Sequence, residues 1–132
     1  MIFVDASAFV AIIAREPGYG SLALALEAEE SLVCSAVSIW ETVAALVRSH
    51  RYSVASATAV VGGYIHDLGM RYVPIEAREN ELAIAAFERF GKGRHQAALN
   101  MGDCFASACA KANGVKLLFK GGDFALTDVD AA

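Results

Sequence analysis

The order of apolar and polar positions along the chain predicts strands that alternate with helices. Short apolar runs bounded by turn residues are typical of buried strands, whereas longer segments rich in Ala and Leu favour helices. The predicted strands are residues 1–4, 32–34, 72–75 and 115–119, with a short terminal strand after Thr127. The predicted helices are residues 6–14, 20–29, 35 or 37 to 49, 53–68, 77–90 and 102–113. This alternation indicates an α/β fold, in which a parallel sheet of four to five strands is covered by helices on both faces.

The composition is that of a globular protein with one core. The chain has 132 residues, of which 56% are hydrophobic and 20% charged, and this length is close to the commonest domain size. Because no linker, repeat or low-complexity segment interrupts it, we expect residues 1–132 to form a single domain. Its apolar runs are much shorter than the roughly 18 to 20 residues that span a bilayer. The apolar N-terminus has no Lys or Arg before Arg15, which argues against a signal peptide. We therefore expect a cytoplasmic protein without a membrane segment.

The three cysteines are expected to be free thiols. Cys34, Cys104 and Cys109 are an odd number, and all three stand among apolar residues. Buried reduced cysteines are typical of a reducing compartment.

Four carboxylates stand where an apolar segment meets a turn or a helix. They are Asp5, Glu41, Asp103 and Asp123. Functional residues of parallel sheets gather at the carboxyl ends of the strands, so the four could converge on one cleft. Carboxylates that crowd together repel one another and lose hydration, and a hard divalent cation compensates for both costs. The four are therefore candidate ligands of Mg²⁺ or Mn²⁺.

Two of the polar residues also have a purely structural interpretation. The pattern Ser38-x-x-Glu41 resembles a capping box, in which the glutamate would satisfy the start of a helix. Ser7, two residues after Asp5, could hydrogen-bond a ligand or a phosphate, or could act as a hydroxyl at a helix N-terminus. The sequence leaves both alternatives open.

The net charge of −4 hides an uneven distribution. The four carboxylates account for this charge by themselves, and the rest of the chain is near neutral. Basic residues gather in the segment 91–120, which contains only one acid, Asp103. Within it, Lys92, Arg94 and Lys120 are candidate contacts to substrate phosphates, with a solvated surface as the alternative.

Two other acidic α/β classes do not fit the pattern. A phospho-accepting receiver domain needs an acidic pair after the first strand, but Ala6 follows Asp5, and no central strand ends in Asp. A phosphatase with an aspartyl nucleophile typically has Asp-x-Asp there, and this chain has Ser7 at the third position. No Ser-His-Asp or Cys-His pairing is evident either.

Four blocks of sequence carry a resemblance to a known family. They are VDASA at 4–8, SIWE at 38–41, GKGRH at 91–95 continued by ALNMGDC at 98–104, and LFKGGDFALTD at 118–128. In order and spacing, the chain closely resembles the PIN-domain ribonuclease toxins of the VapC family. The likeness covers essentially the whole chain.

The resemblance implies a PIN fold, usually homodimeric, and a cognate VapB-type antitoxin as partner. It places Asp5, Glu41, Asp103 and Asp123 on the acidic metal-binding positions of the family. Relatives often have a second polar or acidic residue where this chain has Gly122, so the surroundings of Asp123 are expected to be less polar. Asp128 is a candidate auxiliary acid.

Together these features predict a Mg²⁺- or Mn²⁺-dependent endoribonuclease that hydrolyses RNA. Asp5 and Asp103 are expected to be the principal metal ligands, with Glu41 and Asp123 completing the shell or orienting the nucleophile. The alternatives are a PIN-like binding module without catalysis and a nuclease acting on DNA.

The sequence also suggests where the antitoxin binds. The apolar side chains around Trp40 and Leu46, and those around Val61, exceed what one sheet face needs. We expect a groove there for an amphipathic antitoxin segment, with core packing as the alternative.

Overall fold

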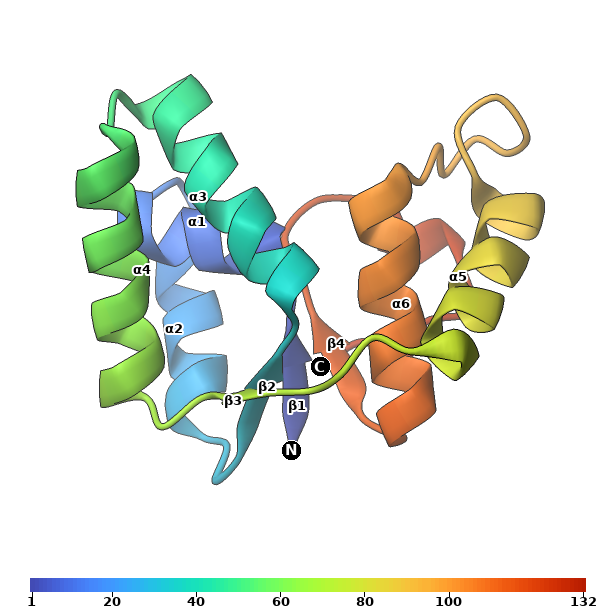
Figure 1. The fold of residues 1–132 in the computed structure, drawn as a ribbon, viewed down its shortest axis with the longest axis horizontal. Helices are drawn as coiled ribbons and strands as arrows, with labels where there is room; N and C mark the ends of the chain where they lie inside the picture. Colours follow the sequence, from blue (N-terminus) through green and yellow to red (C-terminus); the bar gives the residue numbers. More distant parts are fainter.

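Four short parallel strands form the centre of the computed structural model, which describes residues 1–132 (Figure 1). They are β1 (Ile2–Val4), β2 (Leu32–Cys34), β3 (Arg71–Tyr72) and β4 (Lys116–Leu118). Their order is β3-β2-β1-β4, with Ile2 of β1 opposite Leu32 on one side and Lys116 on the other. The first strand is therefore central, and the carboxyl ends of all four strands lie at the same edge of the sheet.

Six helices cover the two faces of this sheet. They are α1 (Ala6–Ala14), α2 (Tyr19–Glu27), α3 (Ala36–His50), α4 (Val54–Asp67), α5 (Ala77–Phe90) and α6 (Met101–Asn113), and a short 3₁₀ helix η1 (Phe124–Leu126) follows β4. Helices α1 to α4 form one group beside the sheet, and α5 and α6 form the other (Figure 1). The predicted α/β architecture with helices on both faces is confirmed.

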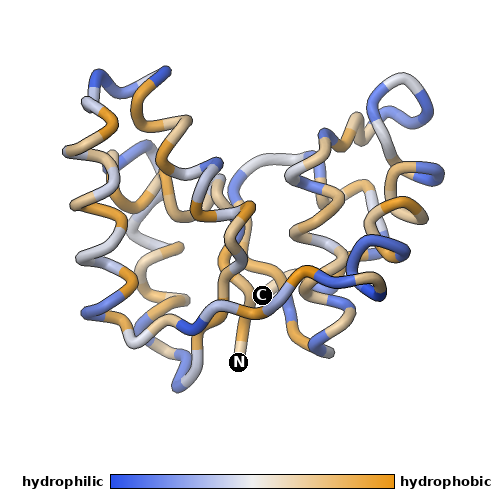
Figure 2. Tube along the Cα trace, in the orientation of Figure 1, coloured by the Kyte–Doolittle hydropathy of each residue, from blue (hydrophilic) through white to orange (hydrophobic).

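The strands alternate their side chains between two separate cores, as the pleat requires. Ile2 and Val4 pack into the core beneath α1 to α4. Phe3 points the opposite way and packs with Val33 and Leu117 into the core beneath α5 and α6. Apolar residues accordingly follow the strands and the helix sides nearest to them (Figure 2). Because both faces are covered, the strands contain continuous apolar runs rather than alternating ones.

The terminal strand that the sequence predicted after Thr127 does not form. Residues 124–126 make a 3₁₀ turn, and Ala131 makes only a single bridge to Leu117. Strand β3 is also shorter than predicted. It ends two residues before Pro74, which has no backbone N–H to donate to a neighbouring strand.

The capping box suggested for Ser38 and Glu41 is wrong. Helix α3 begins one turn earlier, with Ser35 as its N-cap, and Ser38 is the reciprocal partner in the box. The Ser35 hydroxyl accepts a hydrogen bond from the Ser38 amide at 3.1 Å, and the Ser38 hydroxyl accepts one from the Ser35 amide at 2.9 Å. Glu41 is thus released from any capping role.

Most of the apolar side chains of α3 and α4 that the sequence predicts to line a partner groove pack against the core instead. Leu46 and Val61 are buried to 0% and 1% exposure, and Val43 and Tyr64 pack against the same core. Trp40 is the exception, with 69% of its surface exposed. Core packing, the alternative interpretation, accounts for the other side chains.

Two further expectations concern the cysteines and membranes. All three cysteines are buried and free, as predicted. No single helix is long and apolar enough to cross a membrane.

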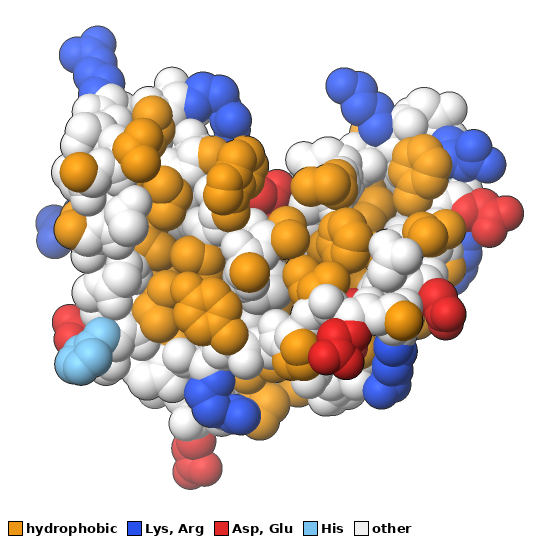
Figure 3. All heavy atoms as spheres, viewed as in Figure 1, with side chains coloured by type: hydrophobic (Ala, Val, Ile, Leu, Met, Phe, Trp, Pro, Cys, Tyr) orange, Lys and Arg blue, Asp and Glu red, His pale blue; other side chains and the backbone are white.

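On the surface, a hollow separates the two helix groups, and acidic atoms are visible inside it (Figure 3).

Candidate active site

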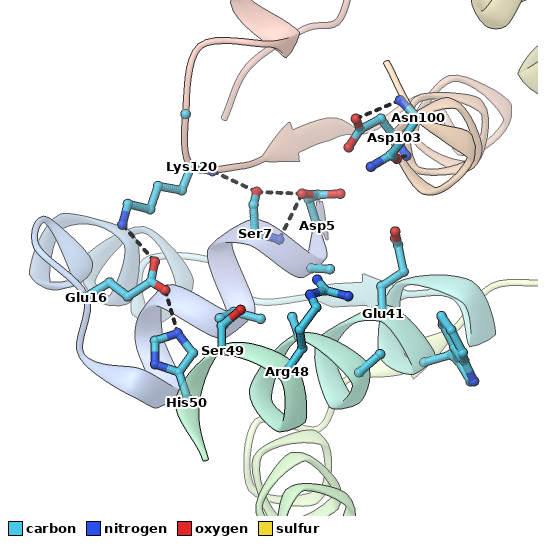
Figure 4. Close-up of a pocket in the computed structure, with 16 residues that line it drawn as sticks. Asp5, Ser7, Glu16, Glu41, Arg48, Ser49, His50, Asn100, Asp103 and Lys120 are labelled. Carbon is cyan, nitrogen blue, oxygen red and sulfur yellow. Dashed lines mark hydrogen bonds and ion pairs between the residues drawn. The ribbon is translucent and has the colours of Figure 1, made fainter. Parts of the chain in front are cut away.

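A cleft of about 510 Å³ opens where β1 and β4 end. The amide of Asp5, the first residue after β1, donates a hydrogen bond to the Leu118 carbonyl of β4 at 2.9 Å and ties the two strand ends together. Helices α3 and α6 supply other parts of the wall. The polar residues that line the cleft are Asp5, Ser7, Glu16, Glu41, Arg48, Ser49, His50, Asn100, Asp103 and Lys120 (Figure 4).

Asp5 is fixed by its position as the N-cap of α1. Its Oδ2 atom accepts hydrogen bonds from the Ser7 amide at 2.9 Å and the Ser7 hydroxyl at 2.5 Å. The same hydroxyl accepts a hydrogen bond from the Lys120 amide at 3.0 Å. Asp5 is only 3% exposed, and burial raises the pKa of its carboxyl against the hydrogen bonds that lower it. Ser7 therefore orients Asp5 and joins it to the loop after β4, while Oδ1 of Asp5 stays available.

Glu41 reaches across the cleft from α3 to the start of α6. Its carboxylate lies directly against Gly102, where an added Cβ would overlap it. Burial, together with the charges of Asp5 and Asp103, raises the pKa of Glu41 to about 7, and the charge of Arg48 partly opposes this shift. A group with this pKa can hold or release a proton near neutral pH.

Asp103 occupies the third position of α6, and its backbone and side chain both take part in a capping box. Its amide donates to Asn100 Oδ1 at 2.8 Å, and its Oδ2 accepts from the Asn100 amide at 3.1 Å. Burial raises the pKa of Asp103 to about 6, and the charges of Asp5 and Asp123 add to the rise. The capping box thus holds one carboxylate oxygen and leaves Oδ1 for the cleft.

The other two predicted acids lie outside the cleft lining. Asp123 is exposed in the turn before η1, yet it is near enough for its charge to raise the pKa of Asp103. Asp128 is engaged elsewhere, in ion pairs of 2.8 Å with Arg89 of α5 and 2.8 Å with Lys111 of α6. Asp128 therefore lies outside the cleft and joins the ends of three segments on another part of the surface.

The predicted basic residues separate in the same way. Lys120 lines the cleft. Lys92 lines a different, mostly apolar pocket between α5 and α6. Arg94 lies over the Phe87 ring, 5.6 Å from its centre, and donates to the Glu88 carbonyl at 3.1 Å. The structure therefore brings only one of the three next to the acidic residues.

The side chains of the cleft have the donor chemistry that suits a divalent cation. Asp5, Glu41 and Asp103 offer hard carboxylate oxygens, which Mg²⁺ and Mn²⁺ prefer. All three have a raised pKa, so each carries a cost of ionisation that a cation would remove. The missing side chain of Gly102 leaves the space that Glu41 occupies. As they stand, no three His, Cys, Asp or Glu side chains are close enough to hold one ion directly. The fit to a cation therefore rests on the carboxylate donors and on the cleft that they share.

Sequence reasoning missed several residues of the cleft. Arg48 is seven residues after Glu41, which is two helical turns, so the two share one face of α3. That spacing in the sequence predicts that Arg48 lies on the same side of the helix as Glu41. Asn100 precedes Asp103 by three residues, the spacing of a capping box. Glu16 and His50 had no such signal, because only the packing of α1 against α3 brings them together.

The chain is similar to known proteins over nearly its whole length. The family model described as PIN domain matches residues 2–130. A VapC ribonuclease of Rhizobium meliloti is 38% identical and covers 98% of this chain and 99% of its own length. Ribonuclease VapC of Mycolicibacterium smegmatis is 39% identical, with 97% of both chains covered. Ribonuclease VapC30 of Mycobacterium tuberculosis is 38% identical and covers 96% of this chain and 94% of its own.

A solved structure has the same fold. It is VapC20 of Mycobacterium tuberculosis, described as a toxin that cleaves the sarcin–ricin loop. The two superpose with a TM-score of 0.79 over 100% of this chain and 98% of the other, at 21% sequence identity. At this identity the likeness concerns the arrangement of the strands and helices.

Proposed function

Since this chain belongs to the PIN-domain family, among its VapC ribonucleases, we propose that it is a metal-dependent endoribonuclease, the toxin of a type II toxin–antitoxin pair. The observation that carries the proposal is the meeting of Asp5, Glu41 and Asp103 in one cleft, with Lys120 at its edge. Three carboxylates facing a shared space suit a cation, and a lysine beside them suits the phosphate of a nucleic acid.

Each acid has a role that follows from its surroundings. Asp5 and Asp103 hold Mg²⁺ or Mn²⁺, because each has one oxygen fixed by hydrogen bonds and the other available. When bound, the cation lowers the pKa of a water and neutralises charge on the scissile phosphodiester. Glu41, with its pKa near 7, completes the site or takes a proton from the attacking water. Asp123 acts from outside the cleft through its charge.

Partners follow from the same proposal. The substrate is RNA, and the active form is a homodimer in the cytoplasm, held in check by a cognate VapB-type antitoxin. An antitoxin segment that places an Arg or Lys against Asp5, Glu41 and Asp103 would replace the cation and block the cleft without a change of fold.

The alternative is a PIN-like module that binds RNA or protein without cutting it. It would not need three ionisable groups with raised pKa values in one cleft, because such groups destabilise the fold without a ligand. The presence of all three favours the enzyme.

The test is cleavage of a pool of structured RNAs by the purified protein, with Mg²⁺ or Mn²⁺ and with EDTA. We expect discrete cuts that need the metal and disappear with EDTA. A matched panel of single- and double-stranded DNA separates an RNA nuclease from a DNA nuclease. Absence of cutting with either metal would leave the binding module as the better proposal. Transcriptome-wide mapping of cut sites after brief expression would then identify the RNA.

A further inference from the structure

The cleft also contains two basic side chains. Arg48 and Lys120 are the only Lys or Arg side chains in its lining. The Arg48 side chain makes no hydrogen bond or ion pair with another residue, although its charge reaches Glu41. Its exposed side chain lies between Glu41 and Ser49 in Figure 4. An unpaired guanidinium in a cleft, with five N–H donors in a planar fork, suits a phosphate.

Lys120 is held at the cleft by Glu16. The Lys120 ammonium donates to Glu16 Oε1 at 2.7 Å, and His50 Nε2 lies 2.9 Å from Glu16 Oε2 (Figure 4). Both oxygens of Glu16 are therefore in use, and three segments meet there: the turn after α1, the last turn of α3 and the loop after β4. One N–H group of the Lys120 ammonium donates to Glu16, and the other two can donate to another acceptor.

If RNA binds in the cleft, its phosphates need positive charges in addition to the metal ion. A divalent cation at Asp5, Glu41 and Asp103 carries two positive charges against three carboxylate charges when all three are ionised, so it leaves no excess to neutralise RNA, which carries a negative charge at every nucleotide. The next phosphate along the chain must also be neutralised, or it meets the field of the same carboxylates. Arg48 and Lys120 are the cations that the cleft offers for this purpose.

We propose that Arg48 and Lys120 bind the phosphate of a nucleotide next to the scissile bond, and that Glu16 is the positioning residue that holds Lys120 in the cleft. This inference rests on the proposed RNA substrate and deepens it, since it assigns the second phosphate contact and the direction in which the RNA leaves the acidic side.

The first experiment measures binding of a fluorescein-labelled oligouridine of twelve nucleotides by fluorescence anisotropy. Arg48→Ala and Lys120→Ala should each weaken binding about tenfold and lower the slope of affinity against salt by about one. Arg48→Lys should recover part of the loss. The matched controls are Arg78→Ala and Lys116→Ala, which remove exposed cations outside the cleft and should change neither quantity by as much.

A second experiment locates the phosphate. In an RNA whose cut site has been mapped, each linkage is replaced in turn by a neutral methylphosphonate. For the wild-type protein, one linkage beside the cut site should lower kcat/KM about tenfold. At that linkage Arg48→Ala and Lys120→Ala should show no further loss, because the contact is already missing.

Glu16 is tested through its dependence on Lys120. Glu16→Ala should raise KM and leave kcat nearly unchanged. Glu16→Gln should raise KM less than Glu16→Ala does, because the amide oxygen of glutamine can still accept from Lys120. In the Lys120→Ala background, Glu16→Ala should have no additional effect on KM. Additive effects of the two substitutions would show that Glu16 acts on the fold instead, and would overturn its role.

The outcomes separate this inference from the proposed function. If wild type and both cation variants bind RNA with equal affinity and equal salt slope, or if wild type does not bind it, the phosphate site is overturned. Cutting at the wild-type rate by both variants would overturn it too, while leaving the nuclease intact. RNA that binds through Arg48 and Lys120 but is never cut would keep the site and reject the nuclease.

Discussion

The carboxylate of Glu41 on α3 lies against the Cα atom of Gly102 on α6, in a space that only glycine leaves open. The contact joins the two helix groups at the mouth of the cleft, and it places Glu41 beside Asp103, the next residue along α6. The geometry of the candidate site therefore depends on the absence of a side chain at position 102.

Gly102→Ala is expected to lower cleavage while preserving the fold. The new Cβ would displace only the end of a flexible side chain, and alanine favours a helix over glycine by about 0.5–1 kcal/mol. Thermal unfolding should therefore show unchanged or slightly increased stability, and the cleavage rate should fall at least about tenfold.

The matched control for that variant is Gly63→Ala in α4, where an added Cβ meets nothing within 4 Å. It should gain a similar helix preference and keep the full cleavage rate. Equal activity of both variants would mean that the position of Glu41 is unimportant for the reaction.

The acids should rank by their place in the cleft. Asp5→Asn and Asp103→Asn should lower the cleavage rate more than about a hundredfold, because each removes a charged ligand, and Asp123→Asn about tenfold, because it removes a charge outside the lining. The amide oxygen of an asparagine can still accept from the Asn100 amide in the capping box, so Asp103→Asn should fold and, without metal, should be at least as stable as wild type. Single-turnover cleavage and thermal unfolding measure the two effects. Near wild-type activity of Asp103→Asn would exclude it as a ligand.

Without metal, stability should fall as the pH rises. The folded pKa of Glu41 is about 7, above its ordinary value of 4.5, so between these values the folded protein holds a proton that the unfolded chain has released. Unfolding then releases protons, and the free energy of unfolding decreases with pH through this window. We expect a loss on the order of 1 kcal/mol, because partial exposure of Glu41 screens the repulsion.

Thermal unfolding in EDTA between pH 4.5 and 8 measures this loss, and Glu41→Gln should flatten the profile. Mn²⁺ should raise the unfolding temperature most above pH 7, where the carboxylates are ionised, and least near pH 5. The single tryptophan, Trp40, precedes Glu41 and gives a fluorescence signal for the same titration. A profile that rises with pH in EDTA would contradict the raised pKa values.

Asp128→Asn is expected to leave cleavage unchanged. It weakens two partly exposed ion pairs, with Arg89 and Lys111, so the free energy of unfolding should change by at most about 1 kcal/mol. Chemical denaturation and the cleavage assay test both statements. A loss of activity at full stability would return Asp128 to the list of functional acids.

The order of the strands and helices could be predicted from the amino-acid sequence, because local patterns decide it. Helices α1 and α5 have the predicted bounds, since turn residues mark both ends of each. The apolar runs of β1, β2 and β4 were long enough to identify, and Asp5 and Asp103 could be recognised as acids at the borders of buried segments.

Which of these residues meet depends on how distant segments of the chain pack together. Asp123 and Asp128 are only five residues apart and both were candidate acids, but the chain turns through η1 between them and carries Asp128 to α5 and α6. Glu16 and His50 are separated by 34 residues, and no local pattern records a contact that arises when α1 packs on α3. Likewise, the apolar face of α3 and α4 has the same periodicity whether it binds a partner or its own core. Burial settles that choice, and burial depends on every segment packed around it.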